Sequence, residues 1–169
     1  IRRQRIEADG TLSGGPELLV HQKTTGEPQV EAYGDSGFVF AWSQTPTSVS
    51  AADQSVVDLY RVCSYVPDID KAIQLANHCH EKGYETTINI MAISRAIETE
   101  LDEALQQVEE ESHVIACYLV DSFGALYSEQ IHFLTDKFRS FLKTREVGVH
   151  CHNNQQLGYA NTIEGIIHH

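Results

Sequence analysis

From Val56 onward, the chain alternates between short apolar runs and longer segments with helical periodicity. Four of the apolar runs predict β-strands, near residues 57–64, 86–93, 114–121 and 146–152. The third run is almost continuously apolar, which is typical of a strand that is covered on both faces. The second run is rich in β-branched residues, which favour extended structure.

An amphipathic helix is predicted after each strand, and the strand starts lie about 29 residues apart. This rhythm predicts an α/β fold: a partial TIM (β/α) barrel of about four consecutive parallel βα units with right-handed crossovers. The residues expected to bound the helices are Asp68 or Asp70 with Gly83 for the first, Thr99 for the second, Ser128 for the third, and Gln155 to Ile167 for the fourth.

Residues 1–55 do not follow this rhythm. They are rich in Gly, Ser, Thr and Pro, and they form an irregular N-terminal region with no assigned role. Val30 to Trp42 is expected to hold a strand or a hairpin around Gly34-Asp35. We therefore divide the chain into residues 1–55 and a barrel-like domain over 56–169. The 169 residues fall short of the roughly 250 of a complete barrel.

Composition narrows the classes of partner. The net charge of −12 comes from 24 acidic and 12 basic residues, and it disfavours nucleic acid and anionic membranes as partners. No apolar run approaches the roughly 18 residues of a membrane span. The four cysteines form no CxxC pair, and we interpret Cys63, Cys117 and Cys151 as reduced core residues. A cytoplasmic location is the expectation.

His150-Cys151-His152 is the most informative triplet. Alternation along a strand places His150 and His152 on one face and Cys151 on the other. The pair lies at the carboxyl end of its strand, where (β/α) barrels keep their active sites, and two imidazoles there can converge on one metal ion. The alternative is a polar strand end without chemistry.

Polar residues at the other strands have alternatives of their own. Asp121 and Ser122 end the strand before the histidines, and the alternative for them is a helix-entry turn, because both residue types cap helices. Arg61 is expected to point inward, where it needs an anionic partner from a neighbouring strand or from a substrate. Asn154 either orients the histidines or, as we favour, caps the last helix.

Four short blocks follow one another across about two thirds of the chain. They are Tyr60-Arg61-Val62, Leu119 to Leu126, Val147 to Asn154, and Leu157 to Thr162. In order and spacing they resemble the DRE-TIM metallolyase superfamily (HMG-CoA lyase-like), and within it the 4-hydroxy-2-oxovalerate aldolase-like branch. The resemblance covers about residues 57–167.

The resemblance implies that His150 and His152 bind a divalent metal, Mn²⁺ or Mg²⁺. It implies cleavage or formation of a C–C bond of a 4-hydroxy-2-oxo acid, giving pyruvate and an aldehyde. Asp121 and Ser122 would be catalytic, and Ser122 and Arg61 would contact the 2-oxo acid substrate. A homo-oligomer or an aldehyde dehydrogenase partner is a further implication.

The chain also departs from this superfamily. Its signature, Asp-x-Thr-Leu-Arg-Asp-Gly on the first strand, has only an echo in Asp9 to Gly15, which lacks the arginine and the second aspartate. Whether this chain is an active enzyme is therefore left open, and we expect negligible activity. The alternatives are a Claisen-type acyl-CoA lyase or synthase of the same superfamily, and a non-catalytic fragment or assembly module.

Overall fold

The computed structural model describes residues 2–6, 12–18, 29–33, 37–41, 49, 51–54 and 58–168. The N-terminal region contains two antiparallel hairpins, β1 (Arg2–Ile6) with β2 (Leu12–Leu18) and β3 (Gln29–Tyr33) with β4 (Gly37–Ala41). The second hairpin confirms the prediction for Val30 to Trp42, although its turn at Gly34-Asp35 lies outside the described residues. The first hairpin was not predicted.

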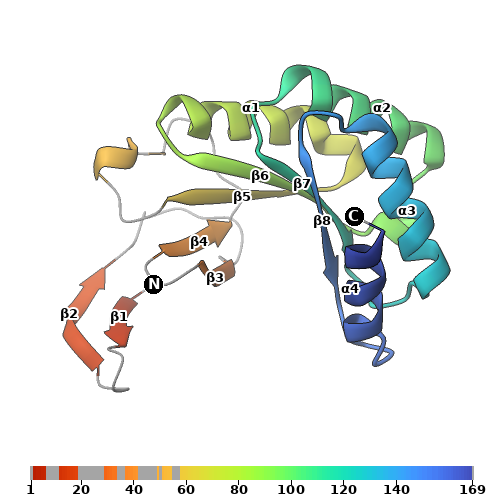
Figure 1. Ribbon diagram of the computed structural model, residues 1–169. Helices are drawn as coiled ribbons and strands as arrows, with labels where there is room; N and C mark the ends of the chain where they lie inside the picture. Colours follow the sequence, from red (N-terminus) through yellow and green to blue (C-terminus); the bar gives the residue numbers. More distant parts are fainter. Residues whose placement is uncertain are drawn as a thin grey trace.

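Residues 58–168 form four parallel βα units in one sheet, as predicted (Figure 1). Each strand pairs in parallel with the next one along the chain, so the sheet order is the sequence order. The strands are β5 (Leu59–Ser64), β6 (Glu85–Ile90), β7 (Ala116–Asp121) and β8 (Glu146–Cys151).

All four helices lie on one side of the sheet (Figure 1), as βα repeats with right-handed crossovers require. Their apolar faces and the outer side of the strands form one core, which includes Ile88, Leu105, Leu119 and Phe138. No helix in the described part of the chain is long and apolar enough to cross a membrane. The helices are α1 (Ile69–Glu81), α2 (Glu98–Glu111), α3 (Ser128–Phe141) and α4 (Gly158–Ile167).

The helix ends differ in detail from the prediction. Gly83 follows α1 with a φ of 95°, so it ends that helix as expected of a glycine. Asp68 precedes α1, but its carboxylate accepts a hydrogen bond from Lys71 Nζ at 2.5 Å and makes no capping bond. Thr99 is not the cap of α2, because the helix already begins at Glu98 with Ile97 before it. Helix α3 begins at Ser128, as predicted.

The strand register sorts side chains between the helix-covered outer face and an inner face. Leu119 pairs with Val149 on the outer face, whereas Tyr118 and Gly148 pair on the inner face.

The four cysteines differ in burial. Cys117 and Cys79 are buried, and Cys151 is half-buried, but Cys63 is exposed. The prediction that Cys63 is a core residue is therefore wrong. It lies on the inner face beside Asn89, away from the helices that bury the outer face.

Burial raises the pKa of Cys79, Cys117 and Cys151, so these three thiols are hard to ionise. For Cys79 and Cys151 the pKa rises from 9.0 to about 11. Because the unfolded chain loses these protons first, we expect the free energy of unfolding to fall as the pH rises from about 9 to about 11. Cys79 would account for about 2 kcal/mol of that fall. Urea unfolding across this pH range measures it. The slope should decrease in Cys79→Ala, and an unchanged slope in that variant would contradict the assignment.

Candidate functional site

His150 and His152 lie together at the carboxyl end of β8. Their ring centroids are 5.1 Å apart, with the ring planes tilted by 59°. His150 pairs with Val120 of β7 in the parallel register, which places it on the inner face. The predicted arrangement of the two imidazoles, on one side and beside the neighbouring parallel strand, is confirmed. Their role as metal ligands stays a prediction.

Gly124, in the loop after β7, packs directly against the loop that carries the second histidine. The backbone at Gly124 has a φ of 55°, and a Cβ there would lie 2.8 Å from the carbonyl oxygen of His152 and 2.7 Å from the amide nitrogen of Asn154. The amide of His152 donates a hydrogen bond to the carbonyl oxygen of Asp121 at 3.3 Å. The loop after β7 thus sets the position of His152.

The side chain of Asp121 lies on the opposite face of the sheet from His150. Asp121 pairs with Cys151 in the register, one position away from the His150 pair, so its side chain lies on the outer face. The carboxylate is fully buried and accepts hydrogen bonds from the amides of Ala125 and Leu126, both at 3.1 Å. These contacts match the alternative interpretation, a helix-entry turn that is held by the aspartate.

Ser122 lies at the same edge of the sheet and joins two strands. Its Oγ accepts a hydrogen bond from the amide of Ala92 at 2.8 Å, which connects the end of β7 to the end of β6. Ala92 has a φ of 52°, in the left-handed region that non-glycine residues seldom adopt. Such residues occur mainly where the surroundings hold them, and they concentrate near functional sites.

Arg61 lies deeper in the sheet. Its guanidinium carbon is 4.9 Å from the ring centroid of Tyr118, which is a cation–π distance. The ring of Tyr118 in turn covers Gly148, where an added Cβ would lie only 2.2 Å from Cε1 of the ring. These three residues form a layer across β5, β7 and β8, below the histidine pair. Arg61 thus contacts an aromatic ring of β7, and its contact with a substrate stays a prediction.

Sequence reasoning missed the importance of two residues of this layer, Tyr118 and Gly148. The signal was the alternation that puts both on the face of His150. In the described part of the chain, Thr87 Oγ1 and Asn89 Oδ1 are also buried without a hydrogen-bond partner on this face.

The predicted capping of α4 by Asn154 is wrong, because Asn153 Oδ1 accepts the hydrogen bond from the amide of Gly158, at 2.9 Å.

The chain is similar in sequence to proteins named 4-hydroxy-2-oxovalerate aldolase. No protein-family model matches the chain. The 4-hydroxy-2-oxovalerate aldolase of Geobacillus thermodenitrificans (strain NG80-2) is 29% identical over 124 residues, 72% of this chain and 35% of that protein. The enzyme of the same name from Bacillus thuringiensis (strain Al Hakam) is 32% identical over 109 residues, 64% of this chain and 31% of that protein. The chain thus spans about a third of the length of these relatives.

The fold has a counterpart among solved structures. A crystal structure of the N-terminal domain of a "putative aldolase" from Bacteroides vulgatus superposes with a TM-score of 0.60 and 24% sequence identity. The superposition covers 76% of this chain and 44% of that one, and at this identity it bears on the fold alone. The chain is therefore a partial homologue of the 4-hydroxy-2-oxovalerate aldolases, with four consecutive βα units of an aldolase-type fold, as the sequence resemblance predicted.

Proposed function

We propose that this chain supplies two ligands, His150 and His152, to the metal site of a divalent-metal-dependent aldolase that acts on a 2-oxo acid. The observation that carries the proposal is the pair of imidazoles 5.1 Å apart on the inner face, at the carboxyl end of β8. In (β/α) barrels this end of the strands holds the catalytic residues. Partial homology to 4-hydroxy-2-oxovalerate aldolases supports the same chemistry.

The residues fit part of such a metal site. Imidazoles are good ligands for divalent ions, but Mn²⁺ and Mg²⁺ prefer oxygen. Among the described residues, no third His, Cys, Asp or Glu side chain groups with this pair. The buried carboxylate of Asp121 is engaged with two backbone amides on the other face. We therefore assign the oxygen ligands to water, to substrate and to residues other than those described.

The chain's own residues would bind and orient the substrate. A bound divalent ion would supply the Lewis acid that polarises the keto group of a 2-oxo acid. Ser122 Oγ accepts a hydrogen bond from the amide of Ala92, and this bond orients the hydroxyl group. We assign the O–H of Ser122 as a hydrogen-bond donor to the substrate carboxylate. Arg61 would act as a positioning residue through Tyr118, because the guanidinium packs on that ring.

Calorimetry with Mn²⁺ tests this assignment. We expect the 169-residue chain to bind Mn²⁺ weakly, and we expect His150→Ala with His152→Ala to weaken binding at least about 10-fold, since even hydrogen-bond partners of ligands are worth about 10- to 100-fold. The matched control is His80→Ala with His113→Ala, which removes another adjacent histidine pair, with ring centroids 5.0 Å apart. Equal loss of Mn²⁺ binding in both double variants would contradict the assignment.

Deuterium exchange into pyruvate tests the chemistry. We expect negligible exchange by the chain alone, because the first-strand arginine and aspartate of the superfamily have no counterpart in Asp9 to Gly15. Loss of one electrostatic donor at such a site commonly lowers the rate about 10²- to 10³-fold. Robust Mn²⁺-dependent exchange that is abolished by His150→Ala would show instead that the chain completes the site by itself.

A further inference from the structure

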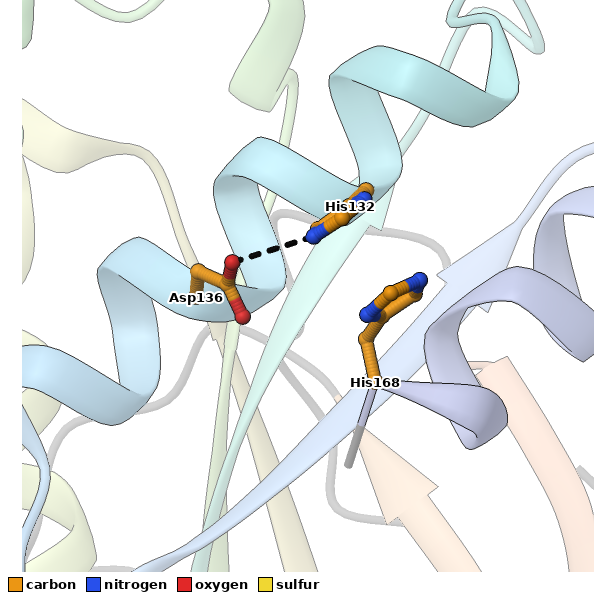
Figure 2. Close-up of side chains that lie close together, drawn as sticks. All are labelled: His132, Asp136 and His168. Carbon is orange, nitrogen blue, oxygen red and sulfur yellow. Dashed lines mark ion pairs between the residues drawn. The ribbon is translucent and has the colours of Figure 1, made fainter.

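Helices α3 and α4 pack side by side outside the sheet, and each presents a polar pair spaced by one helical turn. His132 and Asp136 are four residues apart on α3. Glu164 of α4 and His168, which directly follows α4, have the same spacing. Residues four apart lie on one face of a helix, so the two pairs can meet across the helix–helix contact. Figure 2 shows that His132, Asp136 and His168 do lie close together.

Short distances join these side chains into one cluster. His132 Nε2 is 3.1 Å from Asp136 Oδ2, and the rings of His132 and His168 are stacked with centroids 3.5 Å apart. Glu164 Oε1 lies 3.1 Å from His168 Nε2 and 3.7 Å from His132 Nδ1. One nitrogen or oxygen atom from each of His132, Asp136 and His168 can be chosen so that all lie within 4.8 Å of one another.

Other hydrogen bonds fix the position of α4 beside α3. Arg139 Nη1 donates a hydrogen bond to the carbonyl oxygen of His168 at 2.7 Å, which ties the end of α4 to α3. Asn161 of α4 is buried, and its Nδ2 donates to the carbonyl oxygen of Leu126 at 2.8 Å. The side chains of the cluster itself are partly accessible, with 42% of His132 and 31% of His168 exposed. An ion can therefore reach them from solvent.

We propose that this cluster is a binding site for a late first-row divalent cation of the Zn²⁺ type. His132, Asp136 and His168 are the ligands, and water fills the fourth position. Two imidazoles and a carboxylate are a set that zinc favours, at about 2.0–2.2 Å from the ion. Tetrahedral ligands at that distance are about 3.4 Å apart, so the side chains need to close by about 1.4 Å at most from the 4.8 Å limit. One of the two stacked imidazoles also has to rotate, because each nitrogen binds an ion in the plane of its own ring.

Glu164 would orient the ligands rather than hold the ion. Its carboxylate lies against a nitrogen of each imidazole, and a carboxylate that accepts from a ligating histidine sets which nitrogen faces the metal. Two stacked imidazoles repel each other when both are protonated, whereas a shared cation needs both in the neutral form. Because its ligands come from both helices, the bound ion would hold α4 against α3. This site lies on the helix side of the sheet, away from His150 and His152.

Calorimetric titration with ZnCl₂ tests the proposal, on chain with no added polyhistidine segment and with His150→Ala and His152→Ala in place. This background removes the inner-face pair, so the result does not depend on the proposed aldolase site. We expect one Zn²⁺ per chain and a rise in the thermal midpoint on binding. His132→Ala should weaken binding about 100-fold or more, and Glu164→Gln about 10-fold, because a ligand contributes more than its hydrogen-bond partner.

Two matched controls should leave Zn²⁺ binding unchanged. His80→Ala with His113→Ala removes a second stacked histidine pair, and His169→Ala removes the neighbouring terminal histidine. X-ray absorption of the Zn²⁺-loaded chain should count two imidazoles. Affinity that survives both His132→Ala and Asp136→Ala, or that disappears with His169→Ala, would overturn the assignment. So would the absence of saturable binding in a chain whose circular dichroism shows that it is folded.

Discussion

Replacing Gly124 with alanine should destabilise the protein by about 2–5 kcal/mol and displace His152. A φ of 55° costs a residue with a Cβ about 1–2 kcal/mol. The new Cβ would also lie 2.7 Å from the amide nitrogen of Asn154 and 2.8 Å from the carbonyl oxygen of His152, closer than real contacts allow. Overpacking of this kind costs about 1–3 kcal/mol, because backbone cannot rotate away as a side chain can. Urea unfolding gives the stability change, and NMR of the imidazole protons reports on His152.

Gly83→Ala is the matched control. Gly83 also has a positive φ, 95°, but its Cβ would lie 3.2 Å from the Cβ of Ala52, far along the chain from the histidine loop. This variant should lose stability through backbone strain and the tight contact with Ala52, and it should leave the imidazole resonances of His150 and His152 in place. If Gly124→Ala left the His152 signals unshifted, the contact between the two loops would not control the site as described.

Asp121→Ala should lower stability by about 2–4 kcal/mol. The substitution removes the acceptor of two backbone amides, those of Ala125 and Leu126, at a fully buried position. A buried donor left without a partner costs about 1–3 kcal/mol, and the lost side-chain volume adds to that cost. Asp121→Asn should cost less, since the amide oxygen can still accept one of the two bonds. Urea unfolding of both variants measures the difference.

The same pair of variants separates a structural from a catalytic Asp121. On the structural interpretation, Asp121→Asn stays folded and keeps the weak Mn²⁺ affinity of the parent chain, because the carboxylate lies on the other face from His150 and His152. Unchanged stability in Asp121→Ala, together with lost Mn²⁺ binding in Asp121→Asn, would refute it. It would also add the aspartate to the set of metal ligands.

The order of the four strands could be predicted because each βα unit repeats a local pattern and right-handed crossovers leave few topologies. The pairing of His150 with His152 followed from alternation within one strand. The face of Asp121 was harder, since it depends on the register between β7 and β8, which pairs Val120 with His150 and Asp121 with Cys151. Register arises from packing between strands, so the order of residues in one strand does not contain it.

Errors also arose where side chains compete for the same backbone group. Asn153 and Asn154 are equally good caps by residue type, and only the course of the loop decides that Asn153 reaches the amide of Gly158.

Two other errors have different causes. Cys63 lies in an apolar run, but an apolar sequence does not say which face of a sheet is covered by helices. Thr99 suits a cap, which would start the helix at Glu100, yet α2 begins two residues earlier, at Glu98, a difference of the size by which helix ends commonly vary.

The ring of Tyr118 covers Gly148 on the inner face, below the histidine pair. Gly148 and His150 are two residues apart on one side of β8, which corresponds to about 7 Å along the strand. The ring of Tyr118 therefore lies about one strand repeat below His150 on the inner face. Only a residue without a side chain leaves room for that ring at position 148, so this glycine decides which group lies beneath the histidine pair.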